Sequence, residues 1–143
     1  MARFTCSGRA TIAGSSTLPL VSLYATTGVR PKVVEVGVFN TTSTALVVAL
    51  VRLTTAGTQG AGLTEVGEDD PAQTAIATGF AGHTGGPTIG GELRRASLGA
   101  AVGSGVIWTF SGLAIPSTTG DGIGVYVPTG TGQVCDYSIT WDE

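Results

Sequence analysis

The amino-acid sequence predicts a single all-β domain over residues 1–143, built as a sandwich or small barrel with at most short helical turns. Three observations predict this fold. Apolar and polar residues alternate near both ends of the chain, a valine-rich apolar run lies between them, and 23 glycines help to separate the apolar runs. A chain of 143 residues can bury one hydrophobic core but not two, so we expect one domain.

The two ends carry the clearest strand pattern. In residues 4–12 the even positions are apolar or small and the odd positions are polar, and residues 134–141 alternate in the same way. A period of two is typical of a strand with one buried face. Because the apolar faces match, we expect the terminal strands to be neighbours, which makes a jelly roll the best single topology. The pattern does not give register or strand order.

Further strands are expected between the ends, beginning with residues 20–25. Residues 33–39 and 45–53 flank the turn-prone segment 40–43, which indicates a hairpin connection. The second of these runs is apolar at nearly every position and rich in valine, so it predicts a central strand buried on both faces. Two more strands are predicted at residues 105–110 and 122–127.

The middle of the chain, residues 57–91, has the least regular pattern. Asp70, Pro71 and Gln73 match the start of a helix, with an N-cap, a proline at the first helical position and a glutamine at the third. Residues 74–80 are too rich in threonine, isoleucine and glycine to continue it, so we expect at most one helical turn followed by a strand. An exposed loop is predicted at the acidic residues Glu65, Glu68, Asp69 and Asp70.

The composition is poor in charge. Only 12% of the residues are charged, against about 25% in average proteins, and the formal net charge is −3. Such a surface is suited to being covered by a neighbouring molecule. Lys32 is the only lysine and the arginines are scattered, so no basic stripe indicates a direct contact with nucleic acid.

Targeting and membrane signals are not visible in the sequence. No continuous apolar stretch of signal-peptide length begins the chain, and no apolar run reaches the roughly 18 residues that cross a bilayer. We therefore expect synthesis in the cytoplasm and no membrane partner.

Residues with catalytic or metal-binding potential are few. His83 is the only histidine, and it is interpreted as a structural or interface residue. Cys6 and Cys135 lie on apolar strand faces, which predicts buried, free thiols rather than a zinc site or the nucleophile of a Cys–His–acid site. The acidic residues of segment 65–70 match no calcium loop, so a solvated loop is preferred. We expect no catalytic residue, metal or cofactor.

The densest charge cluster outside the acidic loop is formed by Glu92, Arg94 and Arg95. One interpretation is that they make ion pairs between subunits, and the other is an exposed strand with its own salt bridges. Together with His83, these residues are the candidates for an interface.

Three segments have a composition similar to that of a known group of proteins. They are residues 36–42 (VGVFNTT), residues 98–110 (LGAAVGSGVIWTF) and the ending Trp141, Asp142 and Glu143. With its small, alanine-, glycine-, threonine- and valine-rich composition, the chain resembles small virion proteins of tailed bacteriophages and is most similar to head decoration, or cement, proteins. The resemblance implies a β-rich homotrimer on the capsid surface that clamps neighbouring major capsid subunits, with no catalytic residue to carry over.

Three other interpretations are kept. A tail-tube or tail-fibre component would share the composition and the self-association. A trimeric receptor- or sugar-binding jelly roll, akin to the globular heads of collagen-like trimers, would use Trp108, Tyr126 or His83 in an exposed pocket. An enzyme is the weakest alternative, because no set of acid, base and nucleophile is visible.

Overall fold

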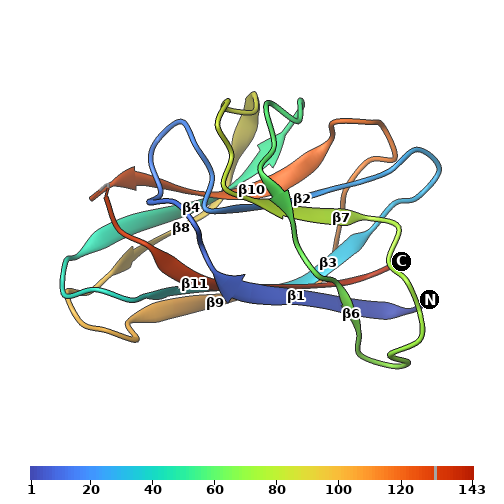
Figure 1. The fold of residues 1–143 in the computed structure, drawn as a ribbon, viewed down its shortest axis with the longest axis horizontal. Coiled ribbons are helices and arrows are strands. Elements are labelled where there is room, and N and C mark those ends of the chain that lie inside the picture. Colours follow the sequence, from blue (N-terminus) through green and yellow to red (C-terminus); the bar gives the residue numbers. More distant parts are fainter. Residues whose placement is uncertain (131) are drawn as a thin grey trace.

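The computed structural model of the chain is a β-sandwich of two antiparallel sheets packed face to face (Figure 1). It describes residues 1–130 and 132–143, and no helix occurs in these ranges. The predicted all-β fold is therefore confirmed. In chain order, the strands are β1 (Arg3–Arg9), β2 (Val21–Tyr24), β3 (Lys32–Asn40), β4 (Leu46–Leu53), β5 (Ala61–Gly62), β6 (Val66–Gly67), β7 (Thr78–Ala81), β8 (Ile89–Leu98), β9 (Gly105–Ala114), β10 (Gly122–Thr129) and β11 (Cys135–Asp142).

The strand order is that of a jelly roll. Sheet 1 has the order β6-β1-β11-β3-β9 and sheet 2 the order β5-β7-β2-β10-β4-β8. Without β5, β6 and β7, which all come from segment 61–81, each sheet keeps four strands, β1-β11-β3-β9 and β2-β10-β4-β8. Eight strands in this order, contributed to the two sheets by two interlocked Greek keys, define the jelly-roll topology.

The terminal strands pair as the sequence predicts. β1 and β11 are antiparallel neighbours over their whole length, from the pair Arg3 and Asp142 to the pair Arg9 and Asp136. Both of these residue pairs also form ion pairs on the outer face of sheet 1, each with a shortest N···O distance of 2.7 Å. The opposite face of both strands enters the core, with Phe4 and Trp141 stacked at a centroid distance of 6.1 Å.

The connection between β3 and β4 corrects a prediction. Segment 40–43 is not a hairpin turn, because β3 belongs to sheet 1 and β4 to sheet 2. Buried Asn40 shapes this crossing between sheets. Its Nδ2 donates to the carbonyl oxygens of Thr44 (2.8 Å) and Gly99 (3.1 Å), and its Oδ1 accepts from the N–H of Thr42 (3.0 Å). An asparagine of this kind turns the chain within a hairpin or between sheets, so local sequence does not distinguish the two.

Segment 61–81 forms short strands and turns, as its irregular sequence indicates. The expected helix start is a single turn, in which Asp70 accepts hydrogen bonds from the N–H groups of Ala72 (2.9 Å, to Oδ1) and Gln73 (3.1 Å, to the carbonyl oxygen). The strand predicted after it is β7, which pairs with β2. Glu65 differs from the expected solvated loop, because it is half-buried and its Oε1 accepts from the N–H of Gly79 at 2.9 Å.

Sheet 2 is covered on both faces. Its inner face contributes to the main core, and its outer face carries a second buried cluster of Tyr24, Ala49, Val51, Leu53 and Tyr126. Figure 1 shows the loops of residues 54–60 and 82–88 standing above this sheet. Strand β4 is therefore buried on both sides, as predicted, with only Val47 and Arg52 half-buried. The outer face of sheet 1 has no comparable cover in the described ranges.

Candidate functional site

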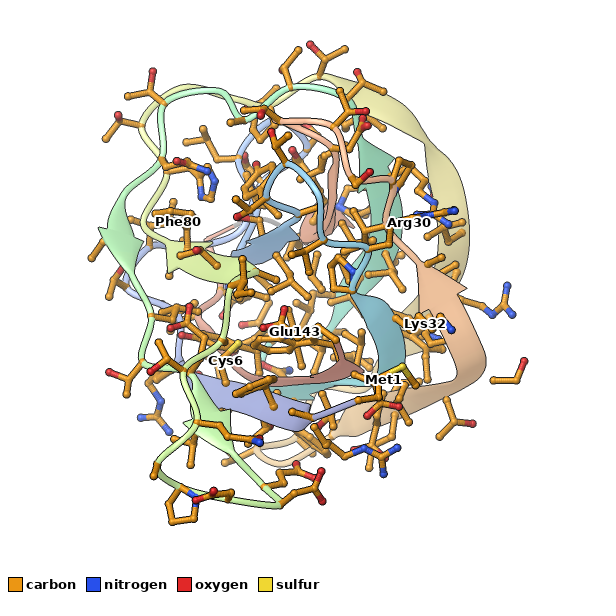
Figure 2. The ribbon with its side chains drawn as sticks, turned by 90° about the vertical axis from the view of Figure 1, so that its right-hand side faces the viewer. Met1, Cys6, Arg30, Lys32, Phe80 and Glu143 are labelled. Carbon is orange, nitrogen blue, oxygen red and sulfur yellow. The ribbon has the colours of Figure 1, made fainter. Side chains whose placement is uncertain are left out.

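The longest strands of the sandwich, β8 and β9, run along one of its sides (Figure 2). Each has 10 residues, and each is the last strand of its sheet. In the described part of the chain, β8 pairs only with β4 and β9 only with β3, so neither has a partner strand on its outward edge. We name β8, β9 and the turn of residues 99–104 between them the edge-strand side. A long uncovered edge is a template for contact with another chain.

The opposite side of the sandwich is protected. There, both sheets end in strands of only two residues, β6 beside β1 and β5 beside β7. Segment 61–81, drawn in green in Figure 2, wraps this side. Short edge strands are one of the ways in which proteins avoid unwanted strand pairing. The two sides of the sandwich therefore differ, and only the edge-strand side presents long edges.

Half of the exposed large apolar side chains lie on the edge-strand side. Six large apolar residues of the described chain are exposed, and three of them lie here: Ile89 (45% exposed), Val102 (74%) and Ile107 (54%). Single apolar residues on a surface are ordinary. The other three, Met1, Val66 and Ile76, lie outside the edge-strand side, so these side chains support a contact here only together with the two open strands.

The predicted charge cluster divides into two parts on this side. Arg94 is placed over the ring of Phe110, with its guanidinium carbon 5.3 Å from the ring centroid. This cation–π contact joins β8 to β9 across the open side of the sandwich. Phe110 is a residue that sequence reasoning did not select.

Glu92 and Arg95 form the second part of the cluster. The Arg95 guanidinium donates to both carboxylate oxygens of Glu92, with Nη2 to Oε2 at 2.6 Å and Nε to Oε1 at 3.0 Å. This hydrogen bonding lowers the pKa of Glu92 and raises that of Arg95. Because both side chains are largely in solvent, the pair adds little to stability within one chain. The exposed-strand interpretation thus describes the single chain, and the pair is accessible to a partner.

His83, the fourth candidate, is buried away from solvent, with 1% of its surface exposed. Its Nε2 lies 3.2 Å from the hydroxyl of Ser22 on β2, and its ring centroid lies 6.4 Å from that of Tyr24. Its Nδ1 has no hydrogen-bond partner among the described residues. Burial lowers the pKa of His83. The histidine therefore fastens the loop that carries it to the outer face of sheet 2 in its neutral form.

We expect His83 to make stability depend on pH below neutrality. The unfolded chain takes up a proton on this residue near pH 6.5, whereas the folded chain does so only at lower pH, so stability falls as pH falls below about 6.5. Arg9 lowers the pKa of Asp136, and Arg3 lowers that of Asp142. These carboxylates change the pH dependence of stability only below about pH 4.

Melting temperatures measured by circular dichroism between about pH 5 and pH 7 test this expectation. The unaltered chain should melt at a lower temperature at the acidic end, and the curve of His83→Gln should be flatter. Equal slopes for the two proteins would show that the histidine is not responsible.

The cysteines are free and buried, as predicted. Burial raises the pKa of the Cys6 thiol to about 12 and that of Cys135 to about 11, which disfavours the reactive thiolate. The sugar-binding interpretation expected an exposed pocket at Trp108, Tyr126 or His83, and this expectation is wrong. All three side chains are buried, with 9%, 2% and 1% of their surfaces exposed.

The acidic segment and the rest of the described chain show no metal centre. No group of three or more histidine, cysteine, aspartate or glutamate side chains in residues 1–130 and 132–143 is placed to hold an ion. Asp69 instead accepts a hydrogen bond from the backbone N–H of Arg3 at 3.0 Å. In the same ranges, no helix is long and apolar enough to cross a membrane.

Comparisons with protein families, with curated proteins and with solved structures give no match for this chain. The assignment of a function therefore depends on the geometry described above and on the resemblance carried by the sequence.

Proposed function

We propose that the chain is a structural assembly module, a capsid decoration protein of a tailed bacteriophage that forms a homotrimer and stabilises the shell. The observation that carries the proposal is the edge-strand side. It combines two uncovered strands of 10 residues with three exposed apolar side chains on a chain in which only 12% of residues are charged. The trimer and the capsid partner are supported by the resemblance to decoration proteins.

The contact between copies would use side chains more than strand pairing. The register of β8 against β4 shifts between Leu50 and Val51 and again between Arg52 and Leu53, and bulges of this kind twist an edge away from a neighbouring strand. The charged side chains of β8 also disfavour pairing with another strand. Ile89, Val102 and Ile107 would lose their exposed surface in the contact, and the Glu92–Arg95 pair would meet charged groups of the next copy.

The effect on the shell would be additive. A contact of standard size buries about 800 Å² on each partner, and it has to be lost before neighbouring capsid subunits separate. Ligands that bind only the intact state shift the equilibrium toward it, so many copies on one shell raise its resistance to rupture.

Phage particles with and without this chain test the function. Particles that lack it should assemble but release DNA at a lower temperature and after a milder osmotic shock than complete particles. Addition of the purified chain should restore the release curve, which controls for damage during preparation. Equal release curves, or labelling of the chain on the tail instead of the head, would contradict the proposal.

A further inference from the structure

A pocket of about 210 Å³ opens on the outer side of sheet 2, away from the edge-strand side. Its walls come from the end of β2, from β7 and from the loops around residues 56–59 and 119–120. Figure 2 shows Phe80 of this pocket on the side opposite β8 and β9. Four segments that are distant in the sequence thus meet at one opening, and the proposed trimer contact does not use it.

The loop that carries Gln59 is held rigidly. The N–H of Thr58 donates to the carbonyl oxygen of Gly85 at 3.0 Å, and the N–H of Thr84 donates back to the carbonyl oxygen of Thr58 at 3.1 Å. Glycines flank Gln59 where no larger residue fits. A Cβ on Gly57 would lie 2.5 Å from the Gly85 oxygen, and one on Gly60 would lie 2.1 Å from the carbonyl oxygen of Ala81. The backbone at Gln59 is therefore fixed before any ligand arrives.

One wall of the pocket is aromatic. The rings of Tyr24 and Phe80 lie 6.1 Å apart at an interplanar angle of 59°. The Tyr24 hydroxyl donates to the carbonyl oxygen of Ala56 at 3.2 Å, which fixes that ring and leaves the Phe80 ring as the half-buried apolar surface. Aromatic faces pack well against the C–H groups of a small ring.

The remaining lining carries no charge at neutral pH and combines polar side chains with Ala25, Ala56 and Gly120. It includes Gln59 and three threonines, Thr26, Thr78 and Thr119. In the described ranges, the side chains of Gln59 and Thr78 make no hydrogen bond, so an amide and a hydroxyl are available to a ligand. Thr26 donates to the carbonyl oxygen of Ile76 at 2.9 Å and keeps lone pairs that accept. Uncharged donors and acceptors beside an aromatic wall suit a ligand that is neutral and rich in hydroxyl groups.

We propose that this pocket binds a single neutral sugar ring of a glycan. Its volume is below the range of about 300–1,000 Å³ that encloses drug-sized ligands, which limits the occupant to one ring. The lack of a charged lining residue selects against acidic sugars and phosphorylated ligands, which need a cationic partner. None of Trp108, Tyr126 and His83 lines this pocket. The pocket gives the module a binding activity separate from its assembly.

Nuclear magnetic resonance of the isotope-labelled chain, titrated with glucose, galactose, mannose, N-acetylglucosamine and sialic acid, tests the site. At least one neutral sugar should shift the resonances of Gln59 and Phe80, and sialic acid should not. Gln59→Ala should weaken that sugar by about tenfold, the loss expected from one or two hydrogen bonds. The matched control Gln73→Ala changes an exposed glutamine outside the pocket and should leave the affinity unchanged.

Three outcomes would overturn the proposal: no shift with any neutral sugar at concentrations that saturate a millimolar site, equal affinity in Gln59→Ala and the unaltered chain, or preference for sialic acid. Phe80→Leu, with its fold checked by circular dichroism, provides a second variant that removes the aromatic face and keeps an apolar side chain. The mass of the oligomer is measured independently, so failure of sugar binding is distinguishable from failure of the assembly proposal.

Discussion

Replacement of Trp141 by alanine is expected to lower the free energy of unfolding by about 3–5 kcal/mol, the usual cost of removing a buried large aromatic side chain. Trp141 is fully buried on β11, between β1 and β3. Its ring stacks on Phe4, and its Nε1 donates to Glu143 at 3.3 Å. The cavity would open where the two terminal strands are joined to the rest of sheet 1, and a domain has only about 5–15 kcal/mol of net stability.

Urea unfolding at one fixed protein concentration measures this loss, because association makes apparent stability depend on concentration. Trp141→Phe serves as the control. It keeps an aromatic ring in the core and removes the indole N–H, while the Glu143 carboxylate keeps its hydrogen bonds from the N–H groups of Ile76 and Ala77. It should cost clearly less than the alanine variant. A loss below about 1 kcal/mol for Trp141→Ala would contradict the placement of this side chain in the core.

The second large effect is expected at the edge-strand side. Ile107→Asp should convert the oligomer to a monomer, because a carboxylate buried without a partner in a contact between copies costs several kcal/mol. Within one chain Ile107 is 54% exposed, so the fold itself should tolerate the change.

Val66→Asp provides the matched control for this variant. Val66 is 50% exposed on β6, at the protected side of the sandwich. Light scattering should give the mass of the unaltered oligomer for Val66→Asp and the mass of one chain for Ile107→Asp. If both variants kept the oligomeric mass, the edge-strand side would not be the contact.

The parts of the fold that the sequence predicts are those in which burial produces a periodic pattern. β1 and β11 each bury one face, so their residues alternate, and β4 buries both faces, so it reads as continuous apolar sequence. Their matching faces were enough to indicate neighbouring ends and a jelly roll. These strands also contribute side chains to the core, where the transfer of apolar groups out of water decides which side chains point inward.

Strand β8 was indicated only by the exposed-strand interpretation of Glu92, Arg94 and Arg95 and not by its periodicity, and its position explains why. It is an edge strand with most side chains exposed, so it shows no alternation, and its first residue is followed by Gly90 and Gly91, which are typical of loops. The crossing at Asn40 was mistaken for a hairpin because the choice of sheet is made by distant residues, such as Gly99, which accepts one of its hydrogen bonds.

The candidate site was predictable only in part. Glu92, Arg94 and Arg95 stand out as a charge cluster in a sequence with few charges. The contact of Arg94 with Phe110 depends on two sheets meeting at one side, and no local sequence pattern predicts it. The pocket at Gln59 and Phe80 likewise needs four segments that only the topology brings together.

The mass of the unaltered, purified chain in solution tests the central claim most directly. Light scattering without any scaffold, at concentrations rising into the micromolar range, should give a particle of three chains, each of 14.3 kDa. The edge-strand side would then have a partner of the chemistry that its strands and apolar side chains require. A mass of one chain at every concentration would contradict the account.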